Sequence, residues 1–187
     1  CIQTIFLEKR VAERLSESDA AIFHTHLMIL EDRSFINKLE KEIKDGHSAA
    51  YALEKTVADY IEAFAKMDDP YLRERAVDME DIGRRILANL VGDEVDHALY
   101  LKHPSVLVAR VILPSDMASL DNEQILGIIT EDSETNSHAV IMAKSMGIPA
   151  IVGARGALRQ IAPEDDLIID ANSGQIYVKP MEAIRET

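Results

Sequence analysis

Cysteine, basic residues and long apolar runs are all scarce in this sequence. The only cysteine among its 187 residues is Cys1, which excludes an intrachain disulfide framework and a cysteine-rich zinc site and suits a reducing cytoplasm. The 33 acidic residues outnumber the 20 lysines and arginines, and the formal net charge is −13. Because so acidic a surface repels phosphate backbones and anionic lipid, we expect a basic protein rather than nucleic acid as a partner.

Two further absences narrow the possible functions. No apolar run approaches the ~20 residues that span a bilayer, so no membrane role is expected. The serine-nucleophile motif G-x-S-x-G is missing, and with it the usual hydrolase triad. The chain begins at Cys1 without an initiating methionine or a signal-like segment, from which we expect a fragment of a larger multidomain protein.

The first half of the chain has apolar residues at helical spacing. The clearest case is residues 70–92, where apolar residues from Leu72 to Leu90 fall three or four apart and form one stripe along a helix. Asp69 suits its N-cap, and Gly92 suits its end. Three more helices are predicted before it, over residues 13–32, 34–46 and 48–67. Short links between them favour antiparallel packing, so we expect an all-α helical-hairpin subdomain over residues 1–92.

The second half has a different period. Short β-branched runs separated by turn residues predict four strands, over residues 105–113, 125–130, 148–153 and 166–170. Only residues 139–146, AVIMAKSM, keep a helical period between them. Residues 172–174, Asn-Ser-Gly, predict a hairpin turn near the end. We therefore expect an α/β domain over residues 93–187.

His138 stands where a polar loop meets the helix of this second half. Thr135, Asn136 and Ser137 precede it, and all three residue types cap helices. Unpaired amides at a helix start, with the positive end of the helix dipole, favour an anion and keep an imidazole neutral and nucleophilic. His138 could thus carry a phosphoryl group. Spacing alone favours a capping or packing histidine, because no partner ligand lies three or four residues away.

Residues 129–153, ITEDSETNSHAVIMAKSMGIPAIVG, resemble the phosphohistidine motif of phosphoenolpyruvate-utilising enzymes. In that motif a Ser-His pair opens a helix of the type A-x-I-x-A-[RK], followed by G-[IL]-P-A-[IV]-x-G. The first half, through AAIFHTHLMILED and DDPYLRERAVDMEDIGRRILANLVG, is similar to the helical insert of one branch of these enzymes. That branch is the enzyme I family of the bacterial phosphotransferase system, with its nitrogen-related paralogue. The resemblance implies an α/β phosphohistidine (swivelling) domain beside a helical subdomain that docks the small phosphocarrier protein HPr.

The resemblance also implies an activity for particular residues. His138 would take the phosphoryl group from phosphoenolpyruvate and pass it to a histidine of an HPr-like carrier. The phosphoryl group on His138 would be supported by Thr135, Asn136, Ser137 and Lys144. No cofactor or metal ligand is expected within this chain, since magnesium and phosphoenolpyruvate would bind in a C-terminal barrel of the full-length enzyme.

A carrier-binding face is implied on the helical half. Ile22, His26 and Ile29 match it on one helix, and their spacing places them on one helical face. Tyr71 and Arg75 match it on a later helix. An acidic helical half would attract a basic carrier and speed encounter. By residue type alone, Ile22 and Ile29 favour a helical core over an interface, and this alternative stays open.

The chain departs from the enzyme I pattern at three places. Residues 133–136, Ser-Glu-Thr-Asn, replace a glycine pair and an arginine before the active histidine, and Glu134 would repel phosphate. Leu113 replaces a threonine that can bond that histidine. Lys144 replaces an arginine, which keeps the charge but loses the bidentate fork. These differences favour the nitrogen-related paralogue.

The family pattern extends beyond both ends of the chain. Its first strand and helix fall mostly upstream of Cys1, and its barrel and homodimer contact fall downstream of Thr187. We therefore expect this chain to accept phosphate from a phosphorylated carrier without phosphorylating itself from phosphoenolpyruvate. Two other readings remain: the swivelling domain of a pyruvate-dikinase-like enzyme, and a non-catalytic regulatory carrier-binding module in which His138 is structural.

Overall fold

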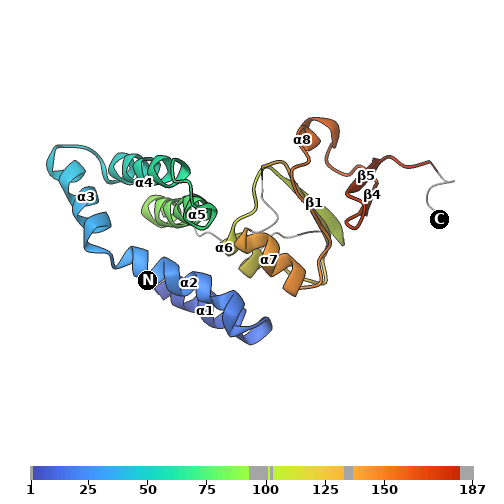
Figure 1. Ribbon diagram of the computed structural model, residues 1–187, viewed down its shortest axis with the longest axis horizontal. Helices are drawn as coiled ribbons and strands as arrows, with labels where there is room; N and C mark the ends of the chain where they lie inside the picture. The colour runs from blue at the N-terminus through green and yellow to red at the C-terminus, as the bar shows by residue number, and fades with distance from the viewer. Residues whose placement is uncertain (1, 93–100, 102, 133–136, 182–187) are drawn as a thin grey trace. The chain divides into compact units, whose positions relative to one another are not determined.

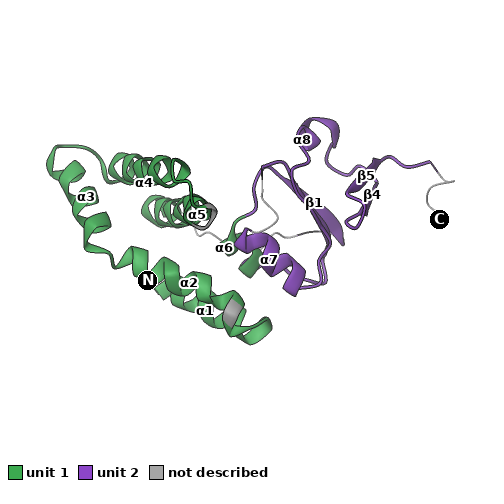
Figure 2. Cartoon of the chain, in the orientation of Figure 1, with its two compact units in different colours: residues 1–97, 113–118 green, residues 98–112, 119–187 purple. Residues whose placement is uncertain are grey.

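The computed structural model describes residues 2–92, 101, 103–132 and 137–181, apart from three side chains (Ser18, Pro70 and Tyr71). The chain divides into two compact units, drawn in different colours in Figure 2. Unit 1 comprises residues 1–97 and 113–118, and unit 2 comprises residues 98–112 and 119–187.

Unit 1 is helical, as predicted. Its long helices are α1 (Ile2–Arg14), α2 (Glu17–Leu30), α3 (Arg33–Lys44), α4 (Ala49–Ala65) and α5 (Pro70–Val91). In Figure 1, α1 lies along α2 and α4 lies along α5, which gives two helical hairpins with α3 between them in the chain. A core formed by α3, α4 and α5 contains Phe35, Leu53, Val57, Met79 and Ile82, all buried.

Side-chain caps explain where these helices begin. The hydroxyl Oγ of Ser48 accepts the Tyr51 amide at 3.2 Å to start α4. Ser16 does the same for α2, because its Oγ accepts the Asp19 amide at 3.1 Å. The helix expected over residues 13–32 is therefore interrupted at Ser16, where the backbone is extended. Helix α1 has no counterpart among the predicted elements.

One segment of the expected α/β domain belongs to unit 1. The buried carboxylate of Asp81 on α5 accepts the Ser115 amide at 2.9 Å and the Ser115 hydroxyl at 2.5 Å. Arg84 pairs with Asp116 on the same segment. The short helix α6 (Pro114–Ser119) starts there, so the strand expected over residues 105–113 ends at Ala109 instead. The boundary expected between residues 92 and 93 thus does not account for residues 113–118, which return to the helical unit.

Unit 2 contains a parallel sheet and a separate hairpin. The sheet has the order β1 (Ser105–Ala109), β2 (Ile125–Thr130), β3 (Ala150–Ile151). The antiparallel hairpin is β4 (Leu167–Asp170) with β5 (Gln175–Val178), and its turn is the predicted one. Two helices complete the unit, α7 (His138–Ser145) and α8 (Ala157–Gln160).

Glycine allows the hairpin to approach the sheet. A Cβ atom added at Gly127 in β2 would lie 2.1 Å from Cδ1 of Ile169 in β4 and 3.3 Å from the Pro149 carbonyl oxygen. A side chain at this point would require the end of Ile169 to shift and would crowd the Pro149 carbonyl oxygen. The remaining residues of β2 are buried except Leu126, as expected for the central strand of a parallel sheet.

Candidate functional site

The first residue of α7 is His138, as the sequence predicts. Burial of one face holds this helix in place: Ala139, Val140, Met142 and Ala143 are all nearly inaccessible to solvent. The Ile141 amide donates to the Ser137 carbonyl oxygen at 3.0 Å and closes the first turn. His138 itself is half-buried at this helix start.

Ser137 occupies the N-cap position without acting as a side-chain cap. Its backbone is extended, with φ −61° and ψ 145°, but its hydroxyl makes no cap hydrogen bond. The hydroxyl Oγ is buried and has no hydrogen-bond partner among the described residues. A buried hydroxyl without a partner costs free energy. Beside a histidine at a helix N-terminus, this hydroxyl and the first amides of the helix form a donor set suited to an anion.

A second buried hydroxyl precedes the same loop. Thr130 is the last residue of β2, is fully buried, and its Oγ1 has no partner in the described part of the chain. Its carbonyl oxygen accepts the Ala154 amide at 2.9 Å, which fixes the strand end. In parallel α/β sheets, ligands bind beyond the carboxyl ends of strands. Sequence reasoning missed Thr130, although its place between a buried strand and a polar loop was a usable signal.

The first residues of the loop are anchored in the structure. The Leu158 amide donates to Glu131 Oε1 at 3.1 Å, and Arg110 Nη1 lies 3.2 Å from Asp132 Oδ2. Thr135 and Asn136, both predicted to support phosphate, lie outside the described residues. The role of residues 133–136, Ser-Glu-Thr-Asn, in binding phosphate therefore stays a prediction.

Lys144 lies at the other end of α7 from His138 and is exposed. The two positions are six residue steps apart, which is about 9 Å along the helix axis. At this end a lysine complements the helix dipole. Its contact with phosphate stays a prediction. Leu113, which replaces the family's threonine, is a buried residue of unit 1.

The residues matched to a carrier-binding face are mostly interior in unit 1. His26 is fully buried and Ile22 is 4% exposed, while Ile29 is partly buried against the helical core. The shared face predicted from their spacing exists, but in this structure it is turned inward, because these apolar side chains are what α2 buries. Arg75 is half-buried, and the side chain of Tyr71 is not described. Their part in carrier binding stays a prediction.

His26 has an unusual environment for a buried histidine. Neither ring nitrogen has a hydrogen-bond partner among the described residues. Nε2 lies 3.7 Å from Oδ1 of Asp78, and Arg75 Nη1 lies 3.4 Å from Oδ2 of the same carboxylate. The Phe23 ring packs edge-on at 5.5 Å. These contacts link α2 to α5 within unit 1.

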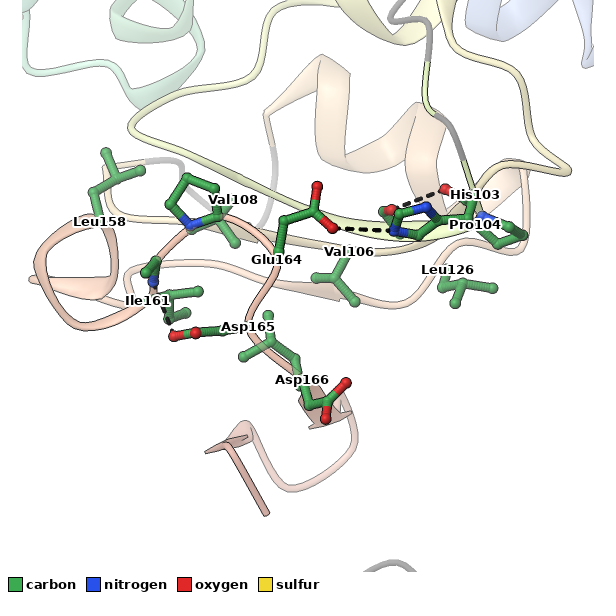
Figure 3. A pocket seen from close by; sticks show the side chains of 14 residues that line it. His103, Pro104, Val106, Val108, Leu126, Leu158, Ile161, Glu164, Asp165 and Asp166 are labelled. Carbon is green, nitrogen blue, oxygen red and sulfur yellow. Dashed lines mark hydrogen bonds and ion pairs between the residues drawn. The ribbon is translucent and has the colours of Figure 1, made fainter.

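A cavity of 580 Å³ in unit 2 lies away from the His138 helix. Figure 3 shows it between β1 and the segment before β4, with Glu164 turned towards His103. Nε2 of His103 lies 3.5 Å from Oε2 of Glu164. Its lining includes no residue of 137–145, so the candidate site is the helix start and not this cavity.

Comparison with known proteins identifies the family. Residues 2–75 match the family model of the PEP-utilising enzyme N-terminal domain, and residues 101–174 match that of the mobile domain. A solution structure of enzyme I (nEIt) is 33% identical, with a TM-score of 0.71, and the match covers 98% of this chain and 75% of that one. The chain belongs to the enzyme I family of PEP-utilising enzymes. The N-terminal domain of the nitrogen enzyme I also matches over 98% of this chain, at 29% identity and a TM-score of 0.57.

Curated members of the enzyme I family agree with this assignment. The phosphoenolpyruvate-protein phosphotransferase of Geobacillus stearothermophilus is 34% identical over 93% of this chain, and that of Listeria innocua is 34% identical over 94%. The matches cover 30% and 31% of those proteins, so the chain spans about a third of their length. Because the helical half is matched as well, enzyme I is favoured over a pyruvate-dikinase-like swivelling domain.

The described residues contain neither a membrane-spanning helix nor a cluster of metal ligands. No helix there is both long and apolar enough to cross a membrane. Within the same ranges, no group of three or more His, Cys, Asp or Glu side chains could hold a metal ion.

Proposed function

We propose that His138 carries a phosphoryl group between phosphoenolpyruvate and a histidine of an HPr-like phosphocarrier. The observation that carries this proposal is the position of His138 at the start of α7, next to the buried hydroxyl of Ser137, which has no hydrogen-bond partner among the described residues. A structural histidine would not account for a polar group left unsatisfied beside it. A phosphoryl oxygen would accept the hydrogen bond that the hydroxyl lacks.

The chemistry consists of two in-line transfers. A neutral ring nitrogen of His138 attacks phosphorus while the bond to the enol oxygen breaks, and pyruvate leaves as its enolate and then takes up a proton. In the second transfer a nitrogen of the carrier histidine attacks, and the phosphorus bond to His138 breaks. Both pass through loose transition states, so positioning and stabilisation of the equatorial oxygens do most of the work. The Ser137 hydroxyl and first amides of α7 would supply that stabilisation.

The other participants belong to the whole enzyme. Phosphoenolpyruvate and magnesium would bind in the barrel domain of the full-length enzyme, which we expect to be a cytoplasmic homodimer. The carrier would dock on unit 1, whose exposed residues on α2 include Met28 at 63% exposure.

Transfer from a phosphorylated carrier tests the proposal with this chain alone. Incubation with radiolabelled phospho-HPr of the sugar type and of the nitrogen type should yield an acid-labile, alkali-stable phosphate on the chain. The label should be lost in His138→Ala and kept in His103→Ala, a matched control because His103 is an exposed histidine of the same unit.

The outcomes separate the competing readings. Label retained in His138→Ala would overturn the assignment of this histidine. Tight binding of either carrier without any transfer would instead support a regulatory module. Label appearing from phosphoenolpyruvate and magnesium alone would contradict the expectation that the donor site lies elsewhere in the full-length enzyme.

A further inference from the structure

A cavity of 460 Å³ lies within unit 1 between the two helical hairpins. Side chains of α1, α2 and α5 line it, and most of the exposed lining is apolar, including Leu30, Ile82 and Ile86. Its volume falls in the range of about 300–1,000 Å³ that small-molecule sites commonly have. It shares no residue with the His138 helix.

The polar end of this cavity contains a buried arginine. Arg85 is 4% exposed, and its Nη2 donates to Thr4 Oγ1 at 2.6 Å. Its Nε is buried without a hydrogen-bond partner among the described residues. Burial lowers the pKa of the Arg85 guanidinium, and the nearby charge of Asp81 opposes that shift.

Asp81 does not satisfy Arg85, although it lies one helical turn away on α5. Both of its carboxylate oxygens accept hydrogen bonds from Ser115. Asn89, at the same end of the cavity, donates to the Arg85 carbonyl oxygen at 2.6 Å and to Gln3 Oε1 at 3.3 Å. The guanidinium is therefore a buried cation with an unused donor, and such groups are normally paired.

We propose that this cavity binds a small amphipathic carboxylate, with its head group on Arg85 and its short apolar tail along Leu30, Ile82 and Ile86. A planar carboxylate matches the guanidinium fork, and one such pair satisfies both partners. A single arginine in a mostly apolar lining suits a single negative charge better than a phosphate dianion, which needs several donors. The tail removes apolar lining from water, which adds to the affinity.

Three probes of equal chain length test the charge requirement on the whole chain: hexanoate, hexanol and hexylammonium. Binding is followed by amide chemical shifts in ¹H–¹⁵N NMR and by the rise in Tm that a ligand of the native state produces. We expect hexanoate to shift the amides around Thr4, Ile82 and Arg85 at millimolar concentration. Hexanol should bind about tenfold or more weakly, because a charge-assisted pair is lost, and hexylammonium should not bind.

Two variants locate the site. Arg85→Gln should abolish hexanoate binding, while Arg84→Gln should keep it, since Arg84 is an exposed neighbour that pairs with Asp116. If Arg85→Gln does not fold, Ile86→Trp fills the cavity without removing the arginine and should also abolish binding. Equal binding of hexanol and hexanoate, no binding of hexanoate, or hexanoate binding that survives either cavity variant would overturn the proposal. The His138→Ala chain should bind hexanoate normally, which separates this test from that of phosphoryl transfer.

Discussion

Buried polar groups differ in kind between the two units. Unit 1 buries charged side chains, namely Asp78, Asp81 and Arg85, together with His26. Over its described residues, unit 2 buries only hydroxyl groups among its polar side chains: Ser119, Thr130 and Ser137. In unit 1 the carboxylates hold separate segments together, as Asp81 holds Ser115. In unit 2 two of the hydroxyls have no partner and flank the loop before His138.

We infer from this difference that buried polar groups serve stability in unit 1 and chemistry in unit 2. The helical unit joins hairpins through charged contacts, which are costly to break because each leaves a buried charge or donor unpaired. The α/β unit depends on strand pairing and apolar packing, and it keeps unsatisfied donors where an anion would bind. Substitutions of buried polar groups should therefore lower stability in unit 1 and phosphoryl transfer in unit 2. Five sets of substitutions test that contrast, from the largest expected effect to the smallest.

Replacement of His138 should abolish function without harming the fold. Because the side chain is half-buried at a helix start, His138→Ala should change the free energy of unfolding by less than about 1 kcal/mol. Phosphoryl transfer from phospho-carrier should fall below detection. Denaturant unfolding and the label-transfer assay measure the two effects. A large loss of stability would mean that His138 is a packing residue instead.

Replacement of Asp81 should instead destabilise the fold of unit 1. Asp81→Ala leaves the buried Ser115 amide and hydroxyl without their acceptor, and we expect a loss of about 3 kcal/mol in the free energy of unfolding. Asp59→Ala, on the exposed side of α4, is the matched control and should lie within about 0.5 kcal/mol of the parent. A mild effect at Asp81 would show that charged contacts do not hold unit 1 together.

A side chain at position 127 should strain unit 2 through packing alone. Gly127→Val places its Cβ against Ile169 and should cost about 1–3 kcal/mol in the free energy of unfolding. A double-mutant cycle with Ile169→Ala checks the cause, because the pair should then cost less than the sum of the single changes. Strict additivity would show that the hairpin does not press on β2 here.

Two N-cap serines should respond differently to alanine. Ser48→Ala in unit 1 removes a cap bond to Tyr51 and should cost about 1 kcal/mol. Ser137→Ala removes a hydroxyl that caps nothing, so stability should stay within about 0.5 kcal/mol of the parent. Phosphoryl transfer should nevertheless slow by about tenfold or more, because a donor to the phosphoryl oxygens is lost. Equal stability losses at the two serines would refute the contrast between the caps.

The smallest effect concerns an exposed ion pair between α3 and α4. This pair is Glu42 with Lys55, and the hydrogen bond from Lys55 lowers the pKa of Glu42. The pair therefore stabilises unit 1 at pH values above the ordinary glutamate pKa. The stabilisation is lost as the pH falls through the lowered pKa of Glu42. Lys55→Met should raise the pKa of Glu42 towards its ordinary value, as carboxyl-carbon NMR titration would record. Lys44→Met, which removes the partner of Glu40 instead, should leave the Glu42 titration unchanged.

Local signals in the sequence determined most of the elements. Helical spacing between Leu72 and Leu90 predicted α5, β-branched runs predicted β1 to β4 of the α/β half, and the polar residues before His138 predicted the start of α7. Ser16 and Asp19 form a capping pair that could also have predicted the break before α2. Such signals act within a few residues of the chain, which is why sequence alone carries them.

Only the tertiary structure decided which faces are buried and which donors lack partners. Spacing places Ile22 and His26 on one face of α2, but it does not say whether that face meets solvent or core. The return of Ser115 to Asp81, the cavity beside Arg85 and the unpaired hydroxyl of Ser137 depend on contacts between distant segments or on the absence of such contacts. These long-range relations have no period and no local motif, because they arise only when the helices and strands pack.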